Sequence, residues 1–79
     1  MLFRSMASMF SDRRLKRAIT KIGNIGKLGV YRFKYLWSDD ELTGFMSDEV
    51  RLVAPDAVSV HSSGYDVVDY NIADRKSVV

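Results

Sequence analysis

Two residues near the start of the chain carry the side chains of a simple nucleophile and base. Ser11 has a hydroxyl, which is a weak nucleophile and attacks a carbonyl carbon only when a base removes its proton. Lys16 can act as that base if burial or neighbouring cations lower the pKa of its amine. Arg13, Arg14 and Arg17 supply such cations, and they would also stabilise a developing oxyanion. This cluster predicts nucleophilic attack on a carbonyl group.

The spacing of Ser11 and Lys16 restricts how they can meet. Ser11 is a good helix N-cap, and Leu15, Ile19 and Ile22 then recur on one apolar helix face. We therefore expect a helix to begin at Ser11, and two helical positions five apart point about 140° away from each other. Either Ser11 lies outside the helix as its cap, or the productive Lys16 comes from another subunit. The alternative without chemistry is a plain N-cap serine and a solvated lysine.

The remainder of the chain alternates between short strands and one more short helix. The predicted strands are 30–37, whose aromatic row is expected to face the core, 42–46, 57–60 and 65–70. A helix is predicted over 47–54, because Pro55 excludes the residue before it from helical geometry. The order α-β-β-α-β-β predicts an α+β domain, a small antiparallel sheet packed with two short helices.

Size and composition favour one small domain that assembles with copies of itself. A chain of 79 residues makes at most one domain and buries a small share of its surface. It contains no cysteine, which excludes disulfides and thiolate metal sites, and its single His61 cannot build a metal site alone. Oligomerisation is the remaining common means of stabilising so short a chain. We expect no metal and no cofactor.

Charge is distributed unevenly along the chain. Residues 1–37 contain nine Arg or Lys and one acid, whereas residues 38–79 contain three basic residues and nine acids. The basic half is typical of a surface that binds a polyanion, so a small nucleic-acid-binding protein is one hypothesis. We favour the alternative that the two halves attract each other within or between subunits, and nucleic acid is not the expected partner.

The apolar start of the chain does not have the form of a secretory signal. Its apolar stretch is short, and Arg4 interrupts it. Elsewhere no apolar run approaches the ~20 residues that a membrane-spanning helix needs. We therefore expect neither a signal peptide nor a membrane span.

A series of short motifs follows in a fixed order along residues 11–70. The series is Ser11-Asp12-x-Arg14-Leu15-Lys16, Tyr31-x-Phe33-x-Tyr35, Gly44-Phe45-Met46-Ser47-Asp48-Glu49-Val50, Pro55-Asp56-Ala57-Val58, Gly64-Tyr65 and Val68-Asp69-Tyr70. Each motif alone is unspecific, whereas the ordered set is specific. The set resembles the intramolecular chaperone auto-processing domain at the C-terminus of phage endosialidase tailspikes, tail fibres and related bacterial and eukaryotic proteins.

The resemblance implies a function and assigns residues to it. Domains of this family help a long fibre fold as a trimer and then cut themselves off before the serine of the first motif. Carried over, the cut lies between Phe10 and Ser11, with Ser11 as the nucleophile and Lys16 as its base. The residues that would support them are Asp12, Arg14 and Glu49. The implied enzyme is a single-turnover serine endopeptidase, and the alternative is a trimerisation or interaction domain that does not cleave.

The resemblance also divides the chain and suggests its partners. Residues 1–10 are an apolar segment before the cut, 11–70 are the domain, and 71–79 are a polar tail that we expect to be frayed. The expected partners are further copies of the chain, as a homotrimer, and the stalk of a phage tail fibre or tailspike. The expected location is the host cytoplasm during phage assembly, or the virion. Many members continue after Val-Asp-Tyr into a long helix that binds the stalk; nine residues follow Tyr70, so we expect this arm to be absent.

Overall fold

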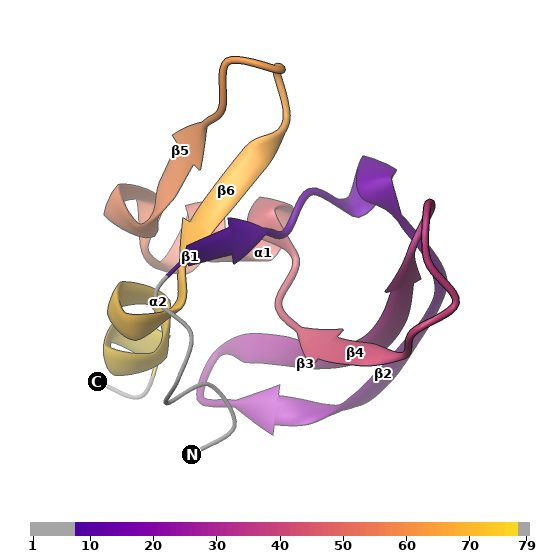
Figure 1. The fold of residues 1–79 in the computed structure, drawn as a ribbon. Helices are drawn as coiled ribbons and strands as arrows, with labels where there is room; N and C mark the ends of the chain where they lie inside the picture. The colour runs from indigo at the N-terminus through magenta and orange to yellow at the C-terminus, as the bar shows by residue number, and fades with distance from the viewer. Residues whose placement is uncertain (1–7, 78–79) are drawn as a thin grey trace.

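The computed structural model describes residues 8–77 and places them in two three-stranded antiparallel sheets and two helices (Figure 1). The strands are β1 (Ser8–Phe10), β2 (Lys16–Ile25), β3 (Leu28–Tyr35), β4 (Leu42–Gly44), β5 (Val58–Val60) and β6 (Asp66–Asp69). The helices are α1 (Ser47–Val53) and α2 (Tyr70–Ser77), with 3-10 turns at Arg13–Leu15 and Pro55–Ala57. The predicted α+β class is confirmed, and the predicted strands and helix between residues 30 and 70 lie close to β3, β4, α1, β5 and β6.

The strand β2 lies where the sequence predicted a helix beginning at Ser11. Only the 3-10 turn Arg13–Leu15 has helical geometry before β2 begins. Ile19, Thr20 and Ile22 are β-branched, which favours strands, and β2 pairs antiparallel with β3 along its length. Backbone pairing with a distant strand therefore outweighs the helical spacing of the apolar residues, and the prediction of a first helix was wrong.

The β2–β3 hairpin is closed by a tight turn, and its register shifts at two places, between Arg17 and Thr20 and between Lys21 and Gly23. Gly26 is the first of the two residues between the strands, and its φ of 55° is a value that glycine adopts without steric cost. Ala18 also has a positive φ, 52°, and the register of the two strands shifts between Arg17 and Thr20. This irregularity is a β-bulge, which bends β2 just after Lys16.

The second sheet joins the two ends of the described chain. Its order is β1-β6-β5, so β6 is the central strand and β1 lies at an edge. β1 and β6 are antiparallel, with Phe10 opposite Val67 and Ser8 opposite Asp69. The residues immediately before Ser11 are therefore held as an extended strand.

Two sheets form in place of the single small sheet predicted, because β1 and β2 were not foreseen as strands. β1 completes the sheet of β5 and β6, and β2 completes the sheet of β3 and β4. The main buried cluster contains Leu28, Val30, Phe45, Val50, Ala54, Ala57, Val68, Tyr70 and Ala73. A second cluster contains Leu15, Phe33, Tyr35 and Met46.

The aromatic row of β3 faces the core only in its central part. Phe33 and Tyr35 are buried and their rings meet edge to face, with centroids 5.1 Å apart. Trp37 is 65% exposed, because β3 ends at Tyr35 and the chain turns away. The Trp37 ring nevertheless stacks on Tyr35, with centroids 4.7 Å apart and an interplanar angle of 5°.

Residues 71–79 were predicted to be a frayed tail, but most of them belong to helix α2. The second helix of the domain therefore lies at its C-terminal side and not at Ser11. The Asp69 carboxylate accepts hydrogen bonds from the backbone N–H groups of Asn71 and Ile72, which are otherwise unpaired in a first helical turn. Ala73 and Ser77 are buried on the inner face of this helix. A cap and a buried face fix this segment although its composition is polar.

Candidate active site

Ser11 is fully buried between the end of β1 and the 3-10 turn. Its backbone is held on both sides, since its N–H donates to the Asp66 carbonyl at 3.2 Å and its carbonyl accepts from Ser47 N–H at 2.8 Å. Its Oγ lies 2.5 Å from the hydroxyl of Tyr70, the first residue of α2. The hydroxyl that the sequence identified as a nucleophile is thus withdrawn from solvent and fixed by a phenol.

Tyr70 reaches Ser11 through a space that only glycine leaves open. A Cβ on Gly44 would lie 2.5 Å from the Tyr70 hydroxyl oxygen, well inside contact distance. The Tyr70 hydroxyl also accepts a hydrogen bond from Phe45 N–H at 2.9 Å, and its ring stacks on Phe45 with centroids 4.9 Å apart. Burial raises the pKa of Tyr70, so this phenol keeps its proton.

Lys16, the first residue of β2, is 6% exposed, and no carboxylate of residues 8–77 lies within ion-pair distance of its amine. Its Nζ donates to the Phe45 carbonyl at 2.8 Å and lies 3.9 Å from the centroid of the Phe33 ring. Burial, with a further contribution from the Arg13 charge, lowers the pKa of Lys16 from 10.5 to about 7. A lysine with this pKa is neutral for much of the time near pH 7, as a general base must be.

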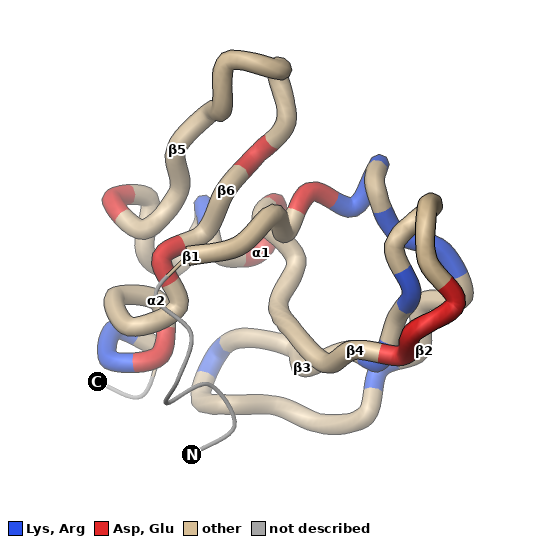
Figure 2. Tube along the Cα trace, in the orientation of Figure 1, with Lys and Arg blue, Asp and Glu red and all other residues tan. Residues whose placement is uncertain are grey.

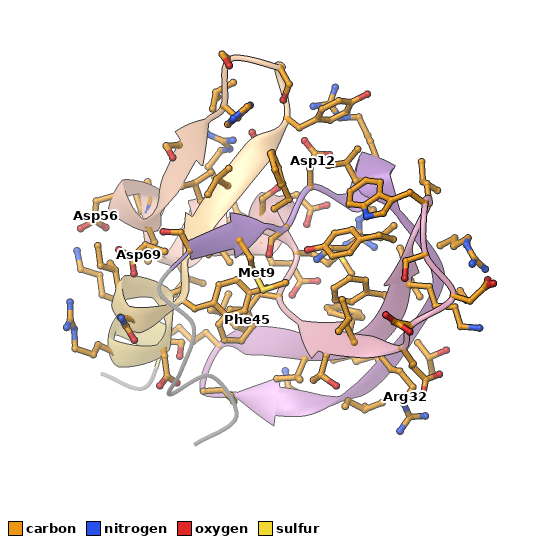
Figure 3. All side chains as sticks on the ribbon, in the orientation of Figure 1. Met9, Asp12, Arg32, Phe45, Asp56 and Asp69 are labelled. Carbon is orange, nitrogen blue, oxygen red and sulfur yellow. The ribbon has the colours of Figure 1, made fainter. Side chains whose placement is uncertain are left out.

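Phe45 brings the two predicted catalytic residues to one place. Its N–H bonds the phenol that contacts Ser11, and its carbonyl bonds the Lys16 amine. Figure 3 shows Phe45 below β1, beside Met9, at the centre of the fold. Ser11 lies before the 3-10 turn, whose N-cap is Asp12, and is therefore not the helix cap that the sequence predicted. A Lys16 from another subunit stays a hypothesis.

Tyr35 contacts the carbonyl group of the bond before Ser11. Its hydroxyl donates to the Phe10 carbonyl oxygen at 2.5 Å. Burial raises the pKa of Tyr35 far above its usual value, so the phenol remains a donor. Sequence reasoning placed Tyr35 in the core as part of an aromatic row and missed this contact, although the motif series included both Tyr35 and Tyr70.

Asp12 and Arg14, two of the predicted supporting residues, pair with each other. The Asp12 carboxylate is buried and accepts from the Arg14 backbone N–H at 3.0 Å and from its guanidinium at 2.7 and 2.9 Å. It also accepts from Asp66 N–H at 3.0 Å, which ties the turn to β6. The Arg14 hydrogen bonds hold the pKa of Asp12 well below its usual range. These contacts shape the loop that carries Ser11.

Glu49, the third supporting residue, joins α1 to β3. Its carboxylate accepts from Gly29 N–H at 3.0 Å and from the Tyr31 hydroxyl, and it lies 3.8 Å from the Arg13 guanidinium. A Cβ on Gly29 would lie 2.8 Å from the Tyr31 ring and 2.9 Å from this carboxylate, so these side chains would have to shift to admit one. These contacts tie α1 to β3, and a supporting role of Glu49 in cleavage stays a prediction.

Basic residues of the first half of the chain pair with acids of the second half. The pairs are Arg13 with Asp48, Arg17 with Asp39 and Arg32 with Glu41, at 3.0, 2.7 and 3.4 Å. Figure 2 shows the basic residues of the hairpin beside the acidic loop before β4. Part of the uneven charge is thus neutralised within one chain.

Within residues 8–77, no helix is long and apolar enough to cross a membrane. The same residues contain no group of three or more His, Cys, Asp or Glu side chains arranged to hold a metal ion.

Comparison with known proteins gives one match. Residues 11–59 match the protein family described as chaperone of endosialidase, a match that begins at Ser11 and covers most of the chain. No curated protein and no solved structure matched. The match supports a chaperone role of the phage-tail type. Because this match covers more than half of the chain, the chain belongs to the chaperone of endosialidase family.

Proposed function

We propose that this domain assists the assembly of a trimeric phage tail fibre or tailspike and releases itself by a single cut between Phe10 and Ser11. The observation that carries the proposal is a buried serine hydroxyl connected to a buried amine of lowered pKa through two residues: Ser11 bonds Tyr70, Tyr70 bonds Phe45 N–H, and the Phe45 carbonyl bonds Lys16. Such a pair is costly to bury and is found where a nucleophile must be activated.

The chemistry begins when the Ser11 hydroxyl turns from Tyr70, its hydrogen-bond partner in this structure, and transfers its proton to the neutral amine of Lys16. Ser11 Oγ forms a bond to the Phe10 carbonyl carbon, and the carbonyl oxygen becomes an oxyanion. The intermediate collapses as the C–N bond breaks, and Lys16 returns the proton to the Ser11 nitrogen. Phe10 is then an ester on Ser11. One water hydrolyses the ester, which leaves a carboxylate on Phe10 and restores the Ser11 hydroxyl.

The segment on both sides of the bond is held still for this attack. Pairing of β1 with β6 fixes Phe10 as part of a strand. The Ser11 N–H and carbonyl each have a backbone partner. Holding nucleophile and carbonyl in one geometry contributes to rate because less freedom remains to be lost at the transition state.

Assembly as a homotrimer is supported by surface that the single chain leaves uncovered. β2 lies at the edge of the β2-β3-β4 sheet, where β3 is its one neighbouring strand among residues 8–77, and edge strands can pair with another chain. Ile22, Leu36 and Trp37 are 45%, 56% and 65% exposed. On this proposal the domain acts in the host cytoplasm during assembly, or in the virion.

The intact mass of the purified full chain tests the cleavage. We expect conversion to a product that begins at Ser11, and no conversion after Ser11→Ala. Ser59→Ala, which removes an exposed hydroxyl from β5, is the matched control and should cleave like the wild type. Hydroxylamine should speed the release and leave peptide 1–10 as a hydroxamate, because it attacks an ester far faster than an amide.

Full-length mass after long incubation of assembled protein would reject autoproteolysis. The remaining function would then be that of a trimerisation or interaction domain that does not cleave. Sedimentation equilibrium of Ser11→Ala measures assembly separately from cleavage, and a monomer at all concentrations would reject that alternative. An unchanged cleavage rate in enforced monomers would show that the Lys16 in use belongs to the same chain.

A further inference from the structure

The oxyanion of the proposed cleavage needs a hydrogen-bond donor, and the arginines named from sequence are engaged elsewhere. Arg13 bonds Asp48 at 3.0 Å. Arg14 bonds Asp12 and the Gly64 carbonyl. Arg17 bonds Asp39 and the Ser38 carbonyl. Among these guanidinium contacts none is to the Phe10 carbonyl oxygen.

The hydroxyl of Tyr35 already donates to that oxygen. The distance of 2.5 Å is at the short end for an O–H donor and carbonyl acceptor. A donor in place before the reaction strengthens as negative charge develops on the oxygen, which is the requirement for selective stabilisation of a transition state.

The ring of Tyr35 is packed between two other aromatic rings. It stacks on Trp37 at 4.7 Å and meets Phe33 edge to face at 5.1 Å. Tyr35 is 9% exposed, so water competes little for the hydrogen bond. A phenol fixed in a dry site costs little reorganisation when the oxyanion forms.

We infer that Tyr35 is a catalytic residue of the self-cleavage, whose hydroxyl stabilises the oxyanion that forms on Phe10 when Ser11 attacks. This inference rests on the proposed function. The phenol donates a hydrogen bond throughout and transfers no proton, since the proton from Ser11 goes to Lys16 and then to the Ser11 nitrogen. Tyr35 thereby takes the role that the sequence had given to the arginines.

The first test compares cleavage rates of the full chain. Tyr35→Phe removes one oxygen and should slow the appearance of the product that begins at Ser11 by about 10²- to 10³-fold, the usual loss for one oxyanion donor. Tyr65→Phe is the matched control; its half-exposed ring lies under Arg14, and it should cleave at the wild-type rate. Tyr35→Phe cleaving as fast as wild type would overturn the inference while leaving the proposed function intact.

The second test does not depend on cleavage. In the Ser11→Ala chain, residue 10 is the only Phe that precedes an Ala, so ¹³C-carbonyl Phe with ¹⁵N Ala gives one carbonyl signal by NMR. Adding Tyr35→Phe should move this signal upfield, because a strong hydrogen bond to the oxygen is lost, while the amide signals of other residues far from the site stay in place. An unmoved carbonyl signal would overturn the inference even if the wild-type chain does not cleave. Changes in amide signals throughout the domain would show that the Tyr35 hydroxyl stabilises the fold instead.

Discussion

Two neighbouring segments, Ser11–Lys16 and Arg17–Ile25, contain similar residue types in very different surroundings. Four of the six residues in the first segment are buried, and none of the nine in the second is. The first segment turns inward between the two sheets, where Ser11, Asp12 and Lys16 bond protein atoms at short range. The second forms the edge strand of a hairpin.

The difference shows that position in the fold, and not residue type, decides which of these side chains can do chemistry. Burial removes water from the Lys16 amine and lowers its pKa to about 7, whereas Lys21 on the same strand is exposed. Arg14 and Arg17 both meet an aspartate at 2.7 Å, yet the Asp12 side chain is 5% exposed and the Asp39 side chain is 96% exposed. Matched substitutions in the two segments therefore test the comparison directly.

The largest contrast should be between the two lysines. Lys16→Met keeps the length and volume of the side chain but removes the base, so we expect self-cleavage to slow by about 10³-fold. Lys21→Met should leave the rate unchanged. The measurement is the fraction of uncleaved chain against time by intact mass. Equal rates in the two variants would remove Lys16 from the mechanism.

The pH dependence of the rate should report the pKa of Lys16. The base is the neutral amine, which predominates only above its pKa, so the rate should fall about tenfold per unit below pH 7 and level off above it. Lys21→Met should keep this midpoint. A rate that continues to rise up to pH 10 would mean that Lys16 keeps the usual pKa of a lysine, and that its burial does not activate it.

Local sequence patterns predicted those helices and strands that depend on residues close to them in the sequence. The alternation of aromatic and basic residues placed β3, and Pro55 placed the end of α1. β2 and α2 were missed because their stability comes from distant partners: β2 pairs with β3, and α2 is capped by Asp69 and buries Ala73. The β-branched Ile19, Thr20 and Ile22 were the available signal for a strand.

The candidate site was predictable in its reactive groups but not in their surroundings. Ser11 and Lys16 lie in one short motif, so their chemistry could be read from residue types. Tyr35 and Tyr70 are 25 and 59 residues away from the atoms that they contact, and only the packing of the two sheets brings them there. Lys16 does not require a neighbouring carboxylate, because Phe45 supplies a backbone acceptor.

Two glycines give the next contrast. In Gly44→Ala the new methyl group would meet the Tyr70 hydroxyl at 2.5 Å and Phe33 at 3.3 Å, so the phenol must move from Ser11. We expect a loss of about 2 kcal/mol in the free energy of unfolding, together with slower cleavage. Gly23→Ala, on the exposed part of β2 with no atom within 4 Å, should change stability by less than about 0.5 kcal/mol. Urea denaturation measures both, and a Gly44→Ala chain as stable as wild type would show that Tyr70 is not held where it contacts Ser11.

The smallest contrast concerns the two aspartates, and it separates burial from ion-pair distance. Asp12→Asn places an amide N–H₂ against the guanidinium of Arg14, donor against donor, and should lower the free energy of unfolding by about 1.5 kcal/mol. Asp39→Asn should cost less than about 0.5 kcal/mol, since an exposed pair is weak whatever its length. Because folding depresses the pKa of Asp12, its contribution is complete above the usual value of 3.8 and is lost as the pH falls below it. Urea denaturation at pH 7 and at pH 3 measures both variants, and the loss of stability caused by Asp12→Asn should be smaller at pH 3. If Asp12→Asn and Asp39→Asn cost the same at pH 7, the 2.7 Å distance, and not the burial of the carboxylate, sets the strength of the pair.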